Sequence, residues 1–529
     1  AHYWGSVMGL AHTYSAVLVG VQAHIIQVQA DVGQGLPGLA LVGLPDSALN
    51  EARDRVRAAV VNSGLKWPDK KVTVSLSPAW LPKRGSGLDV AIAIAILAAH
   101  GQLPVAEVSR ILALGELGLD GSIRPAAGAL ATALALRRSA SHSPDTIAAG
   151  PSDGRTLRAV PGLSVIDVPT LAALVARLTG EQEPDPVGDR EMPTLPATLA
   201  SVDEDTGRDM SEVRGQLEAK RALEIAAAGG HHVALLGRAG VGKTLLAERF
   251  PTLLPDLDDE RALEVTAIHQ LTGRGGNVTD GLLRRPPWFA PHHTASRAAM
   301  VGGGSDSKPS IGLVSSAHHG VLFLDEAAEF EPGVLDALRE PLESGAVSIA
   351  RAGFHLSLPA QFQLVIATNP CPCGNALDTH TGAQCRCTPA QRRKYLARLS
   401  GPLLDRVDVR VVLRRPSIAS LRDDSSPEES AVIATRVALV REAIRHRLAD
   451  TPWTSMVEVS AKELMQRWPL DVSAANALEL ACRDDSLRGR DRVIRVSWTI
   501  AALADRPSPN TGDVEEAVAL RASEDQWVA

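Results

Sequence analysis

The feature that most constrains this chain is the stretch Gly237-Arg238-Ala239-Gly240-Val241-Gly242-Lys243-Thr244. It fits the pattern G-x-x-x-x-G-K-[ST], in which glycines let backbone N–H groups turn inward around phosphate oxygens. Residues 233–236 predict a buried strand before it and residues 245–250 predict a helix after it, so the loop opens a helix N-terminus. We expect Lys243 to neutralise the β- and γ-phosphates of ATP and the Thr244 hydroxyl to ligate Mg²⁺. The alternative, a glycine-rich turn, is disfavoured because strand, loop and helix are all in register.

Two later strands carry polar residues that suit ATP hydrolysis. Residues 321–324 predict an apolar strand that ends in Asp325 and Glu326. After a phosphate loop, such a pair predicts that Asp325 holds Mg²⁺ through water and that Glu326 polarises the attacking water. The strand predicted over 362–368 is followed by Asn369, whose amide can hydrogen-bond the γ-phosphate and the hydrolytic water and so act as a sensor of the γ-phosphate. The alternative for Asn369 is a residue that caps a turn before Pro370.

The residues before the phosphate loop predict a separate α/β domain and a linker. The 529 residues leave room for about two to four domains. Alternating apolar residues at 26–32, a helical face over 48–61, a strand at 71–76 and an apolar helix over 88–100 indicate the first domain. Prolines and acids crowd residues 181–209 without an apolar period, which is typical of an exposed linker.

Composition and charge exclude some partners. The longest apolar run, 90–99, is too short to span a bilayer, and no signal peptide opens the chain, so we expect a cytoplasmic protein with no membrane partner. The net charge of −7 means that any contact with nucleic acid must come from local basic patches.

Four of the five cysteines gather in one loop: Cys371, Cys373, Cys385 and Cys387. Two cysteine pairs on one loop predict tetrahedral thiolate ligation of Zn²⁺. The C-x-C spacing is tighter than the usual C-x₂₋₄-C, so reduced loop thiols or a redox pair stay open as alternatives. The fifth, Cys482, lies in an apolar helix and is expected in the core.

Two further stretches differ from the motifs around them. Residues 266–310 form a glycine-, proline- and histidine-rich excursion that includes His292 and His293. Adjacent histidines rarely ligate one metal unaided, so loop packing or DNA contact is the favoured interpretation. Residues 346–351 and 354–358 alternate as two arms of a hairpin. Loops as long as the excursion are usually functional or disordered.

The order of these motifs resembles the ComM/YifB family, the Mg-chelatase-like AAA+ ATPases, from about residue 14 to about residue 503. Residues 38–45, 51–59 and 81–85 carry its N-terminal part. The resemblance implies an α/β chain with a Lon-protease-like domain at 8–180, the linker at 181–209, an AAA+ core at 210–415 and a C-terminal helical lid at 416–529. The excursion is then a helix-2 insert, and the hairpin a pre-sensor-1 hairpin.

The resemblance also implies roles for single residues. A Lon-type protease needs a serine nucleophile and a lysine base, but these positions fall on Gly87 and Leu130, so we expect an inactive scaffold. In the family the segment 400–408 lies at the subunit boundary, so Arg406 is expected to stabilise charge on the neighbouring subunit's nucleotide. The alternative is a salt-bridged surface arginine. The helix predicted from 486 to 503 matches the sensor-2 element, with Arg488 as first choice and Arg495 as second.

The implied function is a homo-hexameric ring that uses ATP and Mg²⁺ to move branched or forked DNA, as the ComM helicases of natural transformation do in branch migration. One alternative is a magnesium-chelatase-like motor that remodels a protein partner for metal insertion. Another is an ATP-dependent protease, which Gly87 and Leu130 weaken. The N-terminal domain and the cysteine cluster argue against a bare chelatase motor, which has neither in that family.

In the family the insert and the hairpin line the ring pore, so DNA phosphates are expected to meet basic residues there. These are Arg274, Arg297, Lys308 and Arg351. The alternative DNA site is the first domain, through Arg53, Arg55 and Arg57.

Overall fold

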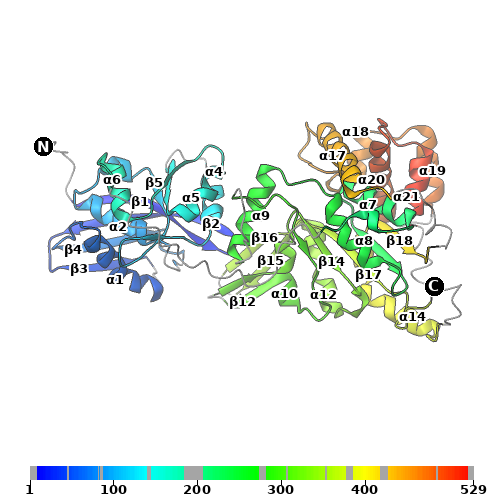
Figure 1. The fold of residues 1–529 in the computed structure, drawn as a ribbon, viewed down its shortest axis with the longest axis horizontal. Helices are drawn as coiled ribbons and strands as arrows, with labels where there is room; N and C mark the ends of the chain where they lie inside the picture. Colours follow the sequence, from blue (N-terminus) through cyan, green and yellow to red (C-terminus); the bar gives the residue numbers. More distant parts are fainter. Residues whose placement is uncertain are drawn as a thin grey trace. The chain divides into compact units, whose positions relative to one another are not determined.

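The computed structural model describes residues 9–43, 47–81, 83, 87–139, 144–183, 207–272, 281–305, 308–351, 354–376, 385–416, 427–483 and 487–521. At 47–50, 304–305, 308–309, 350–351 and 354–355 it describes the backbone alone. The chain forms two compact units (Figure 1). The first holds 1–200 and 259–283, and the second holds 201–258 and 284–529.

The first unit is built on a seven-stranded mixed sheet with the order β3-β4-β2-β1-β5-β8-β9. The hairpin β1–β2 and strand β4 are antiparallel, whereas β3, β5, β8 and β9 each run parallel to a neighbour. The strands are β1 (Leu10–Val19), β2 (Gln22–Gly33), β3 (Gly38–Val42), β4 (Lys71–Ser77), β5 (Ile111–Ala113), β8 (Thr146–Ala149) and β9 (Ser164–Asp167). The main helices are α1 (Ser47–Asn62), α2 (Asp89–Ala99), α4 (Ala129–Arg138) and α6 (Leu171–Thr179).

Sequence patterns account for the main elements of this unit. In β2, Ile26, Val28 and Ala30 are buried while the residues between them are more exposed, as a period of two predicts. All of α2 is buried, in agreement with a helix that is apolar on every side. The strand and helices predicted at 71–76, 48–61 and 88–100 are therefore confirmed, to within one residue at each end.

Helix α9 (Asp259–Leu271) follows the phosphate-loop helix in the chain but is part of the first unit. It packs on α4, and the ion pairs Arg137–Glu260 (2.9 Å) and Arg138–Glu264 (2.8 Å) join the two helices. Residues 266–271, which the sequence suggested as the start of the excursion, are thus the end of a helix. Residues 273–280, with Arg274, lie outside the described residues.

The second unit contains a five-stranded, fully parallel sheet with the order β11-β14-β17-β10-β18. The strands are β10 (Val233–Gly237), β11 (Trp288–Phe289), β14 (Val321–Leu324), β17 (Gln363–Thr368) and β18 (Val409–Leu413). Strand β17 is inserted between β10 and β14. Since parallel strands end at the same edge of a sheet, the residues after β10, β17 and β14 meet there.

Helices complete the second unit (Figure 1). Helices α7 (Leu217–Gly229) and α8 (Lys243–Arg249) contact the sheet, and α13 (Arg339–Ser344) and α14 (Pro389–Leu396) belong to the same unit. The C-terminal helices are α17 (Ser430–Arg447), α18 (Ala461–Arg467), α19 (Val472–Ala481), α20 (Leu487–Leu503) and α21 (Thr511–Ala519). One apolar core runs from the sheet through α7 to the buried Trp498 of α20, so the C-terminal helices share the core of the sheet.

Two hairpins project from this unit. The predicted hairpin is confirmed as β15 (Ala346–Arg351) and β16 (Phe354–Pro359). A second one, β12 (Gly302–Ser305) with β13 (Lys308–Ile311), lies inside the excursion and was not predicted. Most of the predicted linker, 184–206, lies outside the described residues. Among the described helices, none has the length and apolar character that a bilayer crossing requires.

Candidate nucleotide site and cysteine cluster

The phosphate loop joins the buried strand β10 to helix α8 in the second unit. Gly240 and Gly242 have φ of 76° and 100°, in the left-handed region that favours glycine. Helix α8 begins at Lys243, so the loop N–H groups and the helix N-terminus face the same space. The predicted strand, loop and helix are all present.

Lys243 is nearly buried and is held by three oxygens. Its Nζ donates hydrogen bonds to the carbonyls of Gly237 (2.7 Å) and Arg238 (3.0 Å) and to Asn369 Oδ1 (3.0 Å). Burial lowers the pKa of Lys243, while the charges of Asp325 and Glu326 act in the opposite direction. The structure therefore brings the predicted phosphate lysine and the predicted sensor residue into direct contact.

The two residues predicted to hold Mg²⁺ also meet. Thr244 Oγ1 donates to Asp325 Oδ2 at 2.8 Å, although the residues are 81 positions apart. A hydroxyl and a carboxylate on one side of a phosphate loop are the oxygen ligands that Mg²⁺ takes, so this donor set fits the ion. The next residue, Glu326, is exposed and has φ of 47°, a costly conformation of the kind found at active sites.

One glutamine that the sequence analysis did not single out supports the loop. Gln216 has φ of 56°, and its Nε2 donates to the carbonyls of Val241 (3.2 Å) and Arg414 (2.8 Å). It thereby ties the phosphate loop to the end of β18. Its partners could not be read from the sequence, because they lie 25 and 198 positions away.

The predicted arginines Arg406 and Arg488 converge on one carboxylate. Arg406 is buried, and its guanidinium donates to the Pro402 carbonyl and pairs with Glu343 on α13. Arg488, on the exposed first turn of α20, has Nη2 3.9 Å from Glu343 Oε1. Arg406 is thus salt-bridged, as its alternative interpretation proposed, but it is buried rather than on the surface.

Arg495 and its neighbour Arg492 lie deeper in the C-terminal helices. Arg495 Nε donates to the Val459 carbonyl at 2.8 Å, and burial lowers its pKa. Arg492, which the sequence analysis missed, pairs with the fully buried Asp408 at 2.6 Å. The spacing of four residues from Arg488 could have pointed to it, since such residues share a helix face.

The four clustered cysteines come together as predicted. Their sulfurs lie within 4.8 Å of one another. The separations Cys371–Cys373, Cys373–Cys385 and Cys371–Cys385 are 3.4, 3.5 and 3.7 Å. Four sulfurs at about 2.3 Å from a tetrahedral zinc are separated by about 3.8 Å, so the spacing fits this ion. His380, which stands between the two cysteine pairs in the sequence, lies outside the described residues. Cys482 is buried and is not part of the cluster.

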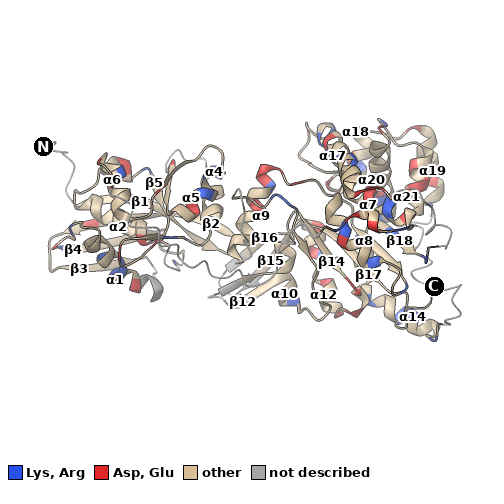
Figure 2. Ribbon diagram, in the orientation of Figure 1, with Lys and Arg blue, Asp and Glu red and all other residues tan. Residues whose placement is uncertain are grey.

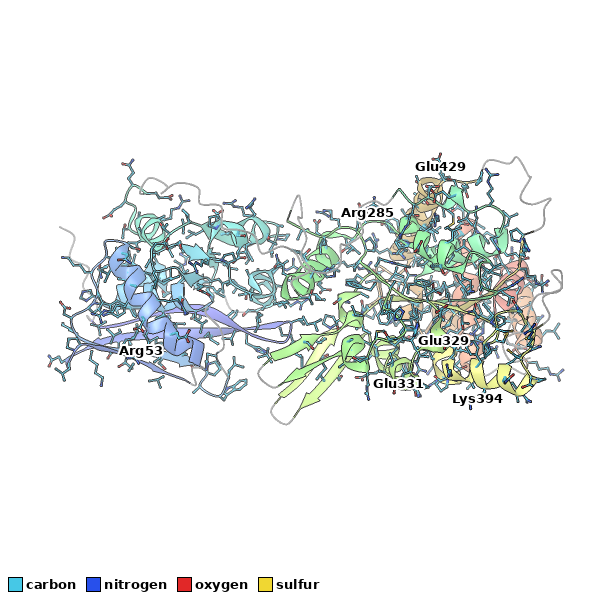
Figure 3. The ribbon with its side chains drawn as sticks, turned by 60° about the horizontal axis from the view of Figure 1, so that its bottom comes forward. Arg53, Arg285, Glu329, Glu331, Lys394 and Glu429 are labelled. Atoms are coloured by element: carbon cyan, nitrogen blue, oxygen red, sulfur yellow. The ribbon has the colours of Figure 1, made fainter. Side chains whose placement is uncertain are left out.

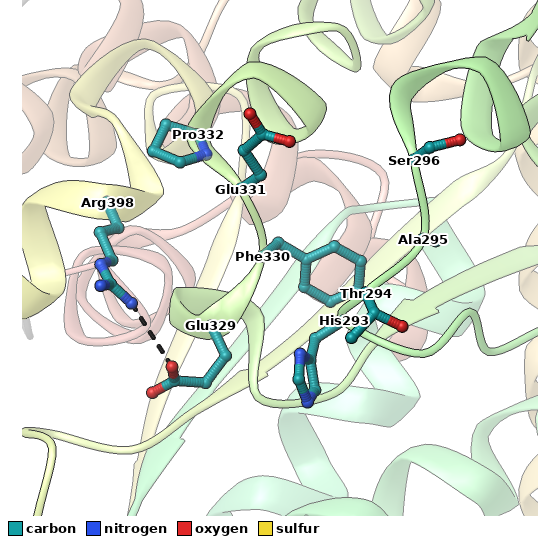
Figure 4. Close-up of a pocket in the computed structure, with 9 residues that line it drawn as sticks. All are labelled: His293, Thr294, Ala295, Ser296, Glu329, Phe330, Glu331, Pro332 and Arg398. Atoms are coloured by element: carbon teal, nitrogen blue, oxygen red, sulfur yellow. Dashed lines mark hydrogen bonds and ion pairs between the residues drawn. The ribbon is translucent and has the colours of Figure 1, made fainter.

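A surface pocket lies between residues 293–296 and residues 329–332 of the second unit (Figure 4). His293, Thr294 and Ser296 line one side, and Glu329 to Pro332 with Arg398 line the other. Arg398 Nη1 lies 3.4 Å from Glu329 Oε2. The rings of His292 and His293 are 4.2 Å apart, and His292 Nδ1 lies 2.9 Å from Thr294 Oγ1, which is the pattern of loop packing.

Basic residues expected to contact DNA differ in their surroundings. Acidic and basic residues are intermixed along the helices of the second unit (Figure 2). Arg297 is exposed at the start of α10 (Arg297–Val301), whereas only the backbone of Lys308 and Arg351 is described. In the first unit Arg53 is exposed on α1 (Figure 3), but Arg55 pairs with buried Asp89 at 2.9 Å.

The expected protease positions in the first unit are Gly87 and Leu130. Gly87 lies in the turn before α2, and Leu130 is fully buried in α4. Lys83, which was not singled out, is fully buried and its Nζ donates to the Pro78 carbonyl, while burial lowers its pKa.

Comparison with known proteins covers almost the whole chain. Three domain families match: "Subunit ChlI of Mg-chelatase" at 28–143, "Magnesium chelatase, subunit ChlI" at 209–421 and "Magnesium chelatase, subunit ChlI C-terminal" at 427–521. The chain is 43% identical to an uncharacterized protein of Mycobacterium tuberculosis (97% of this chain, 99% of that protein). It is 39% identical to the uncharacterized protein YifB of Escherichia coli (97% of each). It is 38% identical to the competence protein ComM of Haemophilus influenzae (97% and 98%).

Proposed function

This chain belongs to the ComM/YifB family of Mg-chelatase-like AAA+ ATPases. On that basis we propose that it forms a hexameric ring that couples ATP hydrolysis to the movement of branched DNA. The family makes the chain an AAA+ ATPase that uses ATP and Mg²⁺. The observation that carries the DNA part is the similarity to a competence protein over 97% of this chain, the first unit included.

The residues of the site divide the work of hydrolysis between them. In this proposal Lys243 binds the β- and γ-phosphates, and its contact with Asn369 supports a role for that amide at the γ-phosphate. Glu326, next to Asp325, orients and polarises the attacking water. When bound, Mg²⁺ neutralises charge on the phosphate oxygens, and Thr244 and Asp325 are the residues that would hold it.

Arg406 is proposed to serve the nucleotide of a neighbouring subunit, and Arg488 is proposed as the sensor-2 residue. Both contact Glu343 on α13 rather than a residue of their own phosphate loop. A guanidinium supplied across a subunit boundary stabilises charge on the transferring phosphoryl group, so a lone subunit would hydrolyse ATP slowly. Arg495 is the weaker choice for the sensor-2 role because it is buried and donates to the Val459 carbonyl.

The cysteine cluster is proposed to hold one structural Zn²⁺. The donor set and sulfur spacing fit a closed site of four thiolates. Protein purified without chelator should contain about one zinc per chain. Protein without metal and with four freely titrating thiols at these positions would exclude the site.

The second candidate function is a chelatase-type motor acting on a protein partner, because all three matching domain families are named for a magnesium-chelatase subunit. ATP turnover by the full chain separates the candidates when it is measured with forked DNA, with unfolded protein and with neither. Stimulation by forked DNA alone is expected. Equal rates in all three reactions would contradict the DNA proposal. Glu326→Gln, which should bind ATP without turnover, supplies the assembled state for counting subunits.

A further inference from the structure

The cysteine cluster begins two residues after Asn369. Strand β17 ends at Thr368, and Asn369 and Pro370 lead to Cys371, which is completely buried. The turn closes with a hydrogen bond from the Gly374 N–H to the Cys371 carbonyl (2.9 Å). A ligand bond at Cys371 therefore restrains the backbone that positions the Asn369 amide.

The same turn lies against the phosphate loop. Gly374 is buried and has φ of 78°, so its backbone is in the left-handed region. A methyl group on its Cα would lie 3.7 Å from the Ala239 amide nitrogen and 3.8 Å from Ala239 Cβ. These are van der Waals distances for an atom that glycine lacks, so the turn lies beside the tip of the phosphate loop with room for little more than a methyl group between them.

The second cysteine pair leads toward Arg406. Cys387 is followed by Thr388, whose Oγ1 accepts from the Gln391 N–H (3.2 Å) while Gln391 Oε1 accepts from the Thr388 N–H (2.9 Å). This capping box starts α14, and the chain continues through two short helices to Arg406. Tyr395 of α14 is buried and hydrogen-bonds Thr368 and Glu329, which ties the helix to the end of β17.

We infer that a metal ion on these four cysteines braces the ATP site by joining the phosphate-loop tip, Asn369 and the helix that leads to Arg406. The inference rests on the proposed function, because it presupposes both ATP hydrolysis and a metal on the cysteines. Thiolate–metal bonds hold a loop in which, among its described residues, few side chains are apolar. Without them Asn369 and Ala239 lose this support, and a misplacement of about 1 Å is enough to slow a reaction about 10²-fold.

The test uses the full chain with Cys385→Ser and Cys387→Ser combined, which leaves the sequence of the turn beside Ala239 unchanged. Cys482→Ala is the matched control, since it removes a thiol outside the cluster. Zinc content, ATP affinity, ATP turnover and thermal unfolding are measured on each protein. The double variant should lose its zinc and at least about 90% of its ATP turnover, because removing groups that orient a metal site reduces activity about 10-fold or more. The control should match the unaltered chain, and the double variant should keep a cooperative unfolding transition.

Three outcomes overturn the inference in distinguishable ways. If the double variant loses zinc but hydrolyses ATP at the normal rate, the inference that the metal supports the ATP site is wrong, while the proposed ATPase activity and zinc site stand. If the unaltered chain holds no metal, both the proposed zinc site and the inferred support of the ATP site are wrong. If the unaltered chain holds zinc but has no ATPase activity under any condition, the proposed function is wrong, and so is the inferred support of the ATP site. Return of turnover when Zn²⁺ is added back to chelator-treated protein supports the inference.

Discussion

The ammonium group of Lys243 lies 3.0 Å from the side-chain oxygen of Asn369, a contact between residues 126 positions apart in the chain. It forms because β10 and β17 are neighbouring parallel strands that end at the same edge of the sheet. In the proposed ATP complex, phosphate oxygens would replace this contact and the contacts with the two loop carbonyls. We therefore expect the two side chains to act at different stages, Lys243 in binding ATP and Asn369 in its hydrolysis.

Lys243→Ala should abolish nucleotide binding, because the charge that faces the phosphates is lost. Asn369→Ala should bind ATP with nearly unchanged affinity but turn it over about 10²-fold more slowly, since the amide acts on charge that develops during the reaction. Equilibrium binding of a fluorescent ATP analogue and phosphate release give the two quantities. Asn62→Ala, an asparagine of the first unit that donates to the Leu119 carbonyl, is the control. Normal turnover by Asn369→Ala would remove the sensor role.

Arg406→Ala should bind ATP but hydrolyse it about 10³-fold more slowly, because the cation supplied to the neighbouring subunit is lost. Mixing this variant with Lys243→Ala subunits should restore some activity, since some boundaries then combine an intact loop with an intact arginine. Arg398→Ala, which breaks the exposed pair with Glu329, is the control. The assigned role is wrong if Arg406→Ala hydrolyses ATP normally, or if mixing restores nothing while both variants assemble.

The second unit should lose stability in mild acid through His232. Its Nδ1 accepts a hydrogen bond from the Leu364 N–H (3.1 Å), which requires a neutral ring, and burial lowers its pKa to about 4. In the unfolded chain the pKa is about 6.5, so between these values the unfolded state binds more protons. The free energy of unfolding should fall by about 2 kcal/mol as pH drops from about 6.5 to about 4.

Urea unfolding at several pH values checks this, with His232→Asn as the comparison because its side-chain oxygen can still accept the Leu364 N–H. The unfolding free energy of His232→Asn should depend less on pH than that of the unaltered chain. Asp408, Arg492 and His231 also face this ring. The pKa of Asp408 lies well below its usual value, so the stability that its charge contributes is lost only at lower pH. Asp89 and Asp153 of the first unit, with pKa raised to about 6 by burial, act in the opposite direction. The quantity to compare is therefore the difference in unfolding free energy between the unaltered chain and His232→Asn at each pH. If the two unfolding free energies depend equally on pH, His232 is not the cause of the acid destabilisation.

Arg351→Ala, in the hairpin β15–β16, should leave ATP binding intact and remove the stimulation of turnover by DNA, because a phosphate contact is lost. Binding of forked DNA should weaken with salt and show little sequence preference. Arg53→Ala on α1 is the matched control and tests the first domain as the alternative site. If Arg53→Ala abolishes DNA stimulation while Arg351→Ala does not, DNA is bound by the first unit.

The sequence by itself determined the family, the strand–loop–helix of the phosphate site, the β15–β16 hairpin and the clustering of the cysteines. These features are local: a phosphate loop needs contiguous N–H groups at a helix N-terminus, and a hairpin needs two alternating arms beside one turn. Local spacing therefore indicates them directly.

Only the tertiary structure decided which of these residues meet. The insertion of β17 between β10 and β14 brings Asn369 to Lys243 and Asp325 to the same edge as Thr244. It also decided that Glu343 receives Arg406, that Gln216 holds the phosphate loop, and that α9 joins the first unit. The physical reason is that strand order and packing set such contacts between residues far apart in the chain, and no local pattern of residues encodes strand order.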